Sequence, residues 1–291
     1  HAGRAAHGAL AVAGGVVRRG LAVALALFSA STIRAAEGQV EPPLMVYAAG
    51  STTGVLGAML KRYEQETGRK VDLRTGPAGL MRERIEAGDK VDLFVSANMA
   101  HPEKLHAEDK GSAVTVFARN RLCVTAQHEV GLTSANLLDK LLDPKVRIGT
   151  STPGADPGGD YAQLFFERAD TVRPGATAAL KAKARQVVGS QIETAPAKPM
   201  TGREGMSERG VDVSIGYCSS RTTSADPSVD KVEIPEKLAI HADYGLTILT
   251  TSLDDRREAA AGQLAIYLLT PNVQALLPAY GFEPSVGQSG K

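Results

Sequence analysis

The 291-residue sequence predicts an α/β fold, and two observations carry that prediction. Short apolar runs typical of buried strands alternate along the chain with longer segments whose apolar residues recur at helical spacing. Loops rich in glycine and hydroxyl side chains join several of the strands to the helices that follow. Strands separated by helices favour a parallel sheet with helices on both of its faces.

The composition is that of an ordinary globular protein. Hydrophobic residues make up 43% and charged residues 22%, which argues against wholesale disorder. The 33 Lys and Arg are balanced by 32 Asp and Glu, so there is no basic excess of the kind that nucleic-acid binding requires. With 4% aromatic residues and no Trp, platforms on which sugars or bases stack would be hard to build.

Residues 1–36 are expected to hold a signal peptide and an extension upstream of it. Arg18 and Arg19 precede the apolar run 20–28, which is too short to span a bilayer, and small residues follow as far as Ala36. This pattern predicts a secretory signal, and a buried or amphipathic helix is the alternative. Cleavage after Ala36 would leave Arg34 at the third position before the cut, where it fits poorly. We therefore expect an exported protein.

The first part of the folded chain begins with a compact strand over 44–49. A helix over 54–67 follows, because its apolar residues at 56, 59, 60 and 63 form one stripe. The run 71–73 predicts the next strand, and the helix expected over 80–87 ends at Gly88. The apolar run 91–96 predicts a third strand.

The same alternation continues to the end of the chain. Strands are expected at 121–125, 146–149, 211–217 and 244–250. Helices are expected at 161–168, 176–187, 255–270 and 272–280. Gly281 ends the last helix, and we expect a disordered tail from Pro284.

The strand-to-helix loops are the candidate sites. They lie at 50–54, 75–79 and 151–160, and Thr201 stands three residues before Glu204 with capping-box spacing. The N-terminus of a helix presents unpaired N–H groups and a partial positive charge, so it attracts anions. Glycine allows a ligand to approach the backbone, and in open α/β sheets these loops gather at the carboxyl ends of the strands. Helix capping explains any one loop; several together favour an anion site.

Other chemistries find little support. No P-loop or dinucleotide-binding glycine motif is present. An exposed Ser51 could serve as a nucleophile, but that would need a histidine base, and no histidine lies beside an evident carboxylate motif. His101, Glu103, His106 and Asp109 crowd one segment, but histidines five residues apart do not share a helix face. We therefore expect a solvated helix surface there, and neither a metal nor a cofactor.

The two cysteines, Cys123 and Cys218, lie in or beside predicted strands. In an exported protein they could form a disulfide, and two buried thiols fit the pattern as well. The sequence leaves both open.

Several segments resemble the molybdate-binding proteins of bacterial ABC importers. Residues 46–52 are similar to the first strand and loop of that family, and residues 84–88 followed by 91–97 are similar to its next helix and strand. The loop 156–162 is similar to the family's Pro-x-Gly-x-Tyr-Ala segment. The strand end 215–217 and the Tyr-Gly-Phe of 280–282 complete an ordered resemblance from about residue 44 to 283.

The resemblance implies a two-lobed type II periplasmic binding protein with its ligand in the cleft between the lobes. Each lobe would be a mixed, mostly parallel sheet flanked by helices. Lobe one would comprise residues 43–121 plus 247–291, and lobe two residues 122–246, with a hinge near Cys123 and Leu246. The implied ligand-binding residues are Ser51, Gly79, Gly158, Thr201 and Tyr217. Gly79 stands near the family's second-loop serine, which this chain lacks, so only backbone donors remain there.

The function implied is capture of molybdate or tungstate and delivery to an ABC permease in the inner membrane. We expect a monomer that catalyses no reaction and binds no nucleic acid. Neutral N–H and O–H donors can surround a fully ionised dianion, whereas the proton of a phosphate would meet another donor. The alternatives are a binding protein for sulfate, phosphate or a small carboxylate, a serine hydrolase that uses Ser51, and a sensor domain. Asp156 is expected to cap the helix that follows it rather than to contact the ligand.

Overall fold

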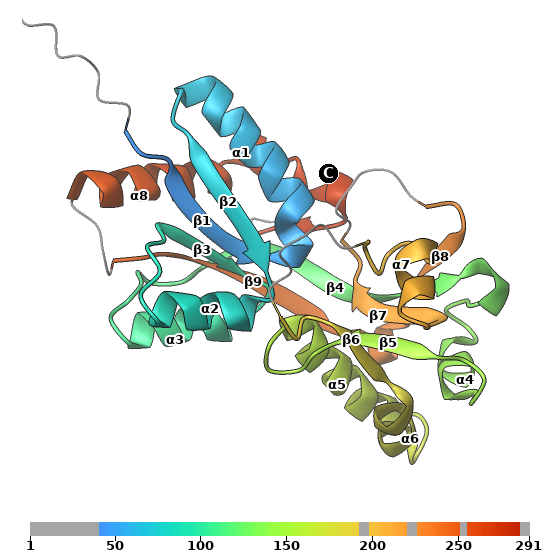
Figure 1. Cartoon of the computed structure of the whole chain (residues 1–291). Coiled ribbons are helices and arrows are strands. Elements are labelled where there is room, and N and C mark those ends of the chain that lie inside the picture. Colours follow the sequence, from blue (N-terminus) through green and yellow to red (C-terminus); the bar gives the residue numbers. More distant parts are fainter. Residues whose placement is uncertain (1–40, 192–197, 220–225, 251–254, 286–291) are drawn as a thin grey trace, which may run out of the picture. The chain divides into compact units, whose positions relative to one another are not determined.

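A mixed ten-stranded sheet carries the fold, and helices lie on its faces (Figure 1). The computed structural model describes residues 41–191, 198–219, 226–250 and 255–285. The expected signal peptide and residues 286–291 of the expected tail lie outside the described residues. The start of that tail is not disordered, because Pro284 lies in a strand and pairs with Ala118. The path through the sheet is β2-β1-β3-β9-β4-β7-β5-β6, and β8 and β10 also pair with β4.

The strands have the following bounds. They are β1 (Leu44–Ala49), β2 (Val71–Gly76), β3 (Leu93–Ser96), β4 (Thr115–Gln127), β5 (Ile148–Ser151), β6 (Arg185–Val188), β7 (Val213–Tyr217), β8 (Val229–Glu233), β9 (His241–Ile248) and β10 (Glu283–Pro284).

The α-helices and short 3₁₀ turns connect these strands. The helices are α1 (Thr53–Thr67), α2 (Ala78–Glu86), α3 (Ala100–Ala107), α4 (Leu137–Leu142), α5 (Pro157–Asp170), α6 (Ala176–Lys183), α7 (Arg203–Glu208), α8 (Asp255–Leu269) and α9 (Pro271–Gln274). The 3₁₀ turns are η1 (Gly50–Thr52), η2 (His128–Val130), η3 (Glu236–Leu238) and η4 (Leu277–Tyr280).

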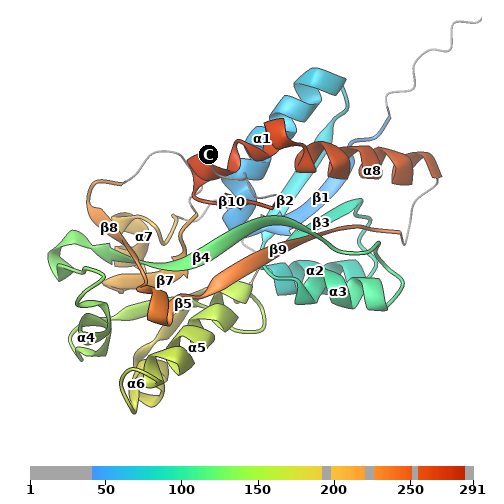
Figure 2. The same ribbon diagram turned by 180° about the vertical axis from the view of Figure 1, so that it is seen from behind.

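The long strand β4 belongs to both halves of the sheet. Its residues from Thr115 to Arg121 pair antiparallel with β9, and those from Leu122 to Gln127 pair antiparallel with β7 and β8. On one side β1 pairs parallel with β2 and β3, and on the other β5 pairs parallel with β6 and β7. Figure 2 shows β4 and β9 running side by side between these two parallel groups.

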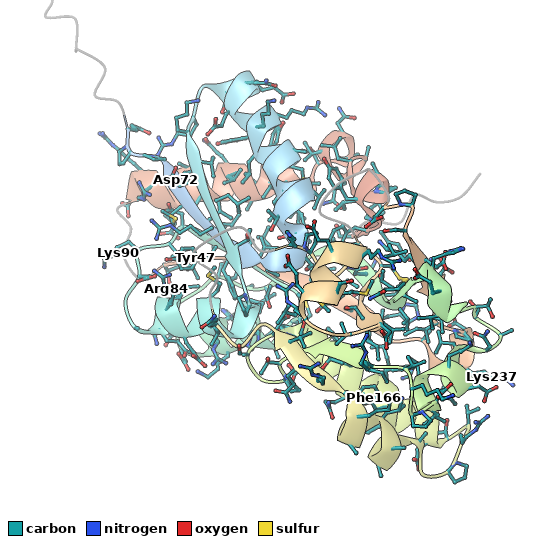
Figure 3. All side chains as sticks on the ribbon, turned by 45° about the vertical axis from the view of Figure 1, so that its right-hand side comes forward. Tyr47, Asp72, Arg84, Lys90, Phe166 and Lys237 are labelled. Carbon is teal, nitrogen blue, oxygen red and sulfur yellow. A yellow bond between two sulfur atoms is a disulfide. The ribbon has the colours of Figure 1, made fainter. Side chains whose placement is uncertain are left out.

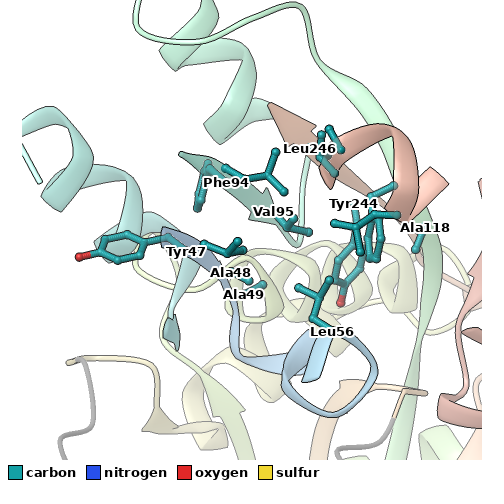
Figure 4. Close-up of a cluster of buried hydrophobic side chains, with 14 of the residues drawn as sticks. Tyr47, Ala48, Ala49, Leu56, Phe94, Val95, Ala118, Tyr244 and Leu246 are labelled. Carbon is teal, nitrogen blue, oxygen red and sulfur yellow. The ribbon is translucent and has the colours of Figure 1, made fainter. Parts of the chain in front are cut away.

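Two hydrophobic cores form, one on each parallel group. The first gathers β1, β3 and the helices α1, α2 and α8, and includes the predicted stripe of α1 (Figure 4). Ala242, Tyr244 and Leu246 of β9 also pack in this first core. The second core centres on α5, whose Phe165 and Phe166 are fully buried (Figure 3). Burying a side chain of this size contributes about 1.5–3 kcal/mol, so each core stabilises its own half of the sheet.

A buried ion pair fastens α8 to the start of β1. Asp92 is 1% exposed, and Arg257 donates from Nε and Nη2 to its two carboxylate oxygens at 2.7 and 2.6 Å. The Met45 N–H also donates to Asp92, at 2.6 Å, and Arg257 reaches the carbonyl of Pro43. Because all these donors meet one carboxylate, the charge is compensated where water cannot reach it.

The cysteines are joined in a disulfide. Cys123 of β4 is bonded to Cys218, the residue after β7. This settles the alternative that the sequence left open. Since Tyr217 lies directly before Cys218 and faces Leu122 in the β4–β7 pairing, the disulfide covalently fixes the end of β7 against β4.

Several sequence expectations need correction. The helix expected to reach residue 187 ends at Lys183, and residues 185–188 form β6 because they pair with β5. The helix expected over 272–280 is divided into α9 and η4, because Pro278 has no N–H to continue a helix. The alternation alone favours parallel pairing, whereas the resemblance implies mixed, mostly parallel sheets, and the antiparallel β4 and β9 between the parallel groups agree with the latter. The strand β8 and the helix α4 were not predicted.

Candidate functional site

Ser51 lies in η1, directly after β1, where the sequence placed its first loop. Its hydroxyl is 2.9 Å from the hydroxyl of Tyr244 on β9. The Asn120 side chain on β4 donates to the same Tyr244 hydroxyl at 3.2 Å and to the hydroxyl of Ser219 at 3.0 Å. A buried polar network therefore links the start of α1 to the segment after β7.

Tyr217, at the end of β7, lies next to this network. Its ring makes edge-on contacts with Tyr244, at 5.6 Å between centroids, and with Tyr161 of α5, at 6.2 Å. Its hydroxyl oxygen is buried and finds no hydrogen-bond partner in the part of the chain that the structure describes. Burial raises the pKa of Tyr217 well above its usual value, and Tyr244 and Asp156 raise it further. The hydroxyl is therefore a neutral donor at physiological pH.

Gly158 begins the N-terminal turn of α5 and brings three side chains together. A Cβ placed on it would lie 3.3 Å from the Ser151 hydroxyl oxygen and 3.5 Å from both Asp156 Oδ1 and Tyr217 Cε2. Glycine leaves that volume free. The end of β5, the N-terminus of α5 and the end of β7 therefore converge on one small polar region.

Asp156 caps α5, as the sequence predicted. Its Oδ1 accepts a hydrogen bond from the Gly158 N–H at 3.0 Å. Burial raises the pKa of this carboxyl, the Gly158 N–H and the Ser151 hydroxyl oppose that rise, and Asp160 adds to it. None of the ion pairs formed within the described residues includes Asp156.

Gly79 lies against the loop that precedes α5. Its N–H donates to the carbonyl of Ala155 at 3.0 Å. A Cβ on Gly79 would stand 2.6 Å from the Gly154 carbonyl oxygen and 2.8 Å from that of Ala155. The structure thus joins the second strand-to-helix loop directly to the third, and the Gly79 N–H is engaged in that contact.

Thr201 lies in the turn before α7. No contact within the described ranges joins it to Ser51, Gly158 or Tyr217. The predicted capping box is wrong, because the N-cap is Gly202 and no side chain caps it. Asp226 instead accepts the N–H of Arg203, at 3.0 Å, from the far side of a loop.

The histidine-rich segment forms the expected solvated helix surface at Glu103, His106 and Asp109, and His101 departs from it. His101 is 9% exposed, and burial is the main cause that lowers its pKa, to about 4. Among the residues that the structure describes, no cluster of three His, Cys, Asp or Glu could hold a metal ion. Within the described residues, the Ser51 hydroxyl forms a hydrogen bond with Tyr244 and with no histidine.

Sequence reasoning missed Tyr244 and Asn120. Tyr244 begins a predicted apolar strand, whose pattern indicates only buried core, and it lies 193 residues from Ser51. Asn120 stands between Arg119 and Arg121, directly before the predicted strand 121–125, so the local pattern does not mark its side chain as buried.

No helix in the described ranges is long and apolar enough to cross a membrane.

A protein family and a curated relative match most of the folded chain. The family model for bacterial extracellular solute-binding proteins matches residues 44–283. The uncharacterized protein PM1146 of Pasteurella multocida (strain Pm70) is 35% identical over 196 residues, which cover 66% of this chain and 80% of that protein.

Two solved structures show the same fold. The periplasmic molybdate-binding protein of Azotobacter vinelandii aligns with a TM-score of 0.66 and 17% identity over 84% of this chain and 100% of that one. The sulfate-binding protein SubI of Mycobacterium tuberculosis H37Rv aligns with a TM-score of 0.65 and 17% identity over 83% and 86%. With a family match across nearly all of its described residues, this chain belongs to the bacterial extracellular solute-binding proteins.

Proposed function

We propose that this chain captures a small tetrahedral oxyanion beside Ser51, Gly158 and Tyr217 and delivers it to an ABC permease. The observation that carries the proposal is the buried Tyr217 hydroxyl, which has no protein partner in the described chain and lies at the N-terminus of α5. A buried polar group without a partner is costly, so a ligand oxygen that accepts from it recovers that cost. The protein would be exported to the periplasm and act there as a monomer without catalysing a reaction.

The other groups of the site are suited to the same ligand. The Ser51 hydroxyl can turn from Tyr244 toward a ligand, and the positive end of the α5 dipole favours an anion. Molybdate and tungstate are supported by the resemblance of the sequence and by the Azotobacter protein of the same fold. The sulfate-binding neighbour supports the wider class of tetrahedral oxyanions.

The two cores supply the lobes that this function requires. We assign residues 43–121 plus 247–291 to one lobe and 122–246 to the other. The pairing of β4 changes partner between Arg121 and Leu122, which supports a hinge there. The contact from Gly79 to Ala155 would then belong to the closed state, in which the loops of the two lobes meet. Thr201 remains a proposed backbone donor from the segment before α7.

The test is a thermal unfolding series of the full chain with molybdate, tungstate, sulfate and phosphate. A ligand present at 100 times its Kd stabilises the fold by about 2.7 kcal/mol, which raises Tm by roughly 5–10 °C in a protein of this size. We expect such a shift with at least one oxyanion, and we expect Ser51→Ala to reduce it. Ser134→Ala, whose exposed hydroxyl donates to the Glu233 carbonyl, is the matched control. No shift with any of the four would overturn the proposal.

A further inference from the structure

We propose that Asp156 holds one proton against the bound oxyanion, so that the site favours an anion that brings its own proton, such as phosphate. A fully ionised anion, such as sulfate or molybdate, would then bind only with uptake of a proton from water. The inference rests on the proposed function and names the property that selects among its ligands. It replaces the donor-only shell expected from sequence with a shell that contains one acceptor.

The first step is the position of the carboxylate. A Cβ placed on Gly158 would lie 3.5 Å from Asp156 Oδ1 and also 3.5 Å from Tyr217 Cε2. Cε2 is bonded to the ring carbon that carries the hydroxyl. The carboxylate that caps α5 is therefore in the same small region as the unpartnered hydroxyl. A ligand oxygen that accepts from Tyr217 comes close to a second acceptor.

The second step is that the carboxylate cannot easily withdraw. Gly189 packs behind it with a φ of +81°, and a Cβ there would lie 2.8 Å from Asp156 Cβ and 3.0 Å from Oδ2. The cap to Gly158 holds the front oxygen in place. Because the side chain is confined on both sides, a bound anion must be accommodated next to it.

The third step is the charge around the carboxylate. Within the described residues, the titratable groups that interact with it are Asp160 from α5, Tyr217 from β7 and Tyr244 from β9, and the Ser151 hydroxyl forms a hydrogen bond with it. None of these carries a positive charge. Burial raises the pKa of Asp156, which shows that its environment favours the protonated form.

These steps make a shared proton the natural arrangement. A bare dianion beside an ionised Asp156 would place like charges in contact at a half-buried site, where water screens them less than at the surface. One proton between a carboxylate oxygen and a ligand oxygen replaces a contact between two acceptors with a charge-assisted hydrogen bond, and where that proton is taken up from water it also removes one negative charge. Phosphate carries that proton at neutral pH. Sulfate and molybdate do not, so Asp156 must take up a proton from water when either of them binds.

The test is isothermal titration calorimetry of the full chain with phosphate, arsenate, sulfate and molybdate at pH 6, 7 and 8. We expect phosphate and arsenate to bind at least tenfold more tightly than sulfate and molybdate at pH 8. The Kd for sulfate and molybdate should rise up to tenfold for each pH unit, since each binding event takes up one proton. The same experiments in buffers of different ionisation enthalpy count that proton directly.

Asp156→Asn is the diagnostic variant, because the asparagine side-chain oxygen keeps the helix cap and the side chain carries neither a charge nor an ionisable proton. It should strengthen sulfate and molybdate binding at pH 8 at least tenfold and remove its pH dependence. The control is Asp160→Asn, since Asp160 accepts the Gly154 N–H at 2.8 Å, and it should leave the order of ligands unchanged.

Each outcome is decisive. Sulfate or molybdate affinity that is independent of pH in the wild type, with no proton taken up, would overturn the role of Asp156 while leaving oxyanion binding intact. That result needs no variant and so does not depend on the folding of Asp156→Asn. Failure of every oxyanion to bind to a cooperatively folded wild type would overturn the proposed function and, with it, this inference.

Discussion

Tyr217 combines two properties that rarely occur together, a fully buried hydroxyl and the absence of a hydrogen-bond partner in the described chain. We predict that Tyr217→Phe lowers oxyanion affinity at least tenfold. The same change should leave the free energy of unfolding of the ligand-free protein within about 1 kcal/mol of wild type, because at most a weak hydrogen bond to Tyr244 is lost. Urea unfolding and calorimetric titration of the same sample separate the two effects.

Tyr161→Phe is the control for that prediction. The Tyr161 ring also contacts Tyr217, but burial and the carboxylates Asp243 and Asp160 raise the pKa of Tyr161 to about 12, so its hydroxyl lies toward acidic groups. We expect little change in affinity. A fall of several kcal/mol in the stability of Tyr217→Phe with unchanged affinity would instead assign its hydroxyl a structural role.

At this scale the sequence indicated part of the site. Ser51, Gly158 and Tyr217 were selected because hydroxyls and glycines at strand-to-helix loops, together with the family resemblance, mark their positions. Tyr244 was not selected, because a tyrosine in an apolar strand has the pattern of a core residue. Its position near Ser51 depends on the pairing of β9 with β3 and β4. Contacts over such separations depend on topology, which local patterns do not contain.

At the scale of elements, the disulfide between β4 and the end of β7 should contribute strongly to stability. Its two residues are 95 positions apart, and closing a loop of that length in the unfolded chain corresponds to about 4–5 kcal/mol in the chain-entropy description. We predict that reduction, or the double change Cys123→Ala and Cys218→Ala, lowers the free energy of unfolding by about 2–5 kcal/mol. Urea midpoints with and without dithiothreitol measure this.

The disulfide also bears on the site, because Cys218 follows Tyr217 directly. Reduced protein that remains folded should bind the oxyanion more weakly than oxidised protein, since the end of β7 is less firmly held against β4. Equal urea midpoints and equal affinities in the two redox states would contradict both expectations.

Element prediction succeeded where one local signal was strong. The strand β1 and helices α1 and α8 follow their apolar patterns closely. β6 was predicted as helix because Lys183, Ala184 and Arg185 favour helices, yet pairing with β5 overrides that preference. The antiparallel direction of β9 could not be derived from periodicity, because a buried strand has the same apolar pattern in either direction.

At the scale of the whole molecule, His101 makes stability depend on pH. Its pKa is lowered from 6.5 to about 4, mainly by burial and then by Arg82, so the unfolded chain takes up this proton before the folded one. Stability from this group is therefore complete above pH 6.5 and is lost as the pH falls toward 4. We predict a loss on the order of 1–2 kcal/mol over that range, allowing for solvent screening.

Urea unfolding at pH 7, 5.5 and 4.5 checks this expectation. His101→Gln should flatten the decline, because glutamine does not titrate, whereas the same change at exposed His241 should leave it unaltered. A decline of equal size in the two variants would show that other groups cause the acid sensitivity.

The last prediction concerns how the two cores meet. Gly79, from the first, donates its N–H to Ala155, beside the second, and a side chain there would stand 2.6 Å from the Gly154 carbonyl oxygen. We predict that Gly79→Ala keeps the loops apart and lowers oxyanion affinity by tenfold or more, although the new methyl group touches none of Ser51, Gly158 and Tyr217. Because each core keeps its own packing, the midpoint of urea unfolding without ligand should change little. Small-angle scattering should show that saturating oxyanion compacts the wild type but not Gly79→Ala. A variant that binds and compacts like the wild type would mean that this contact plays no part in closure.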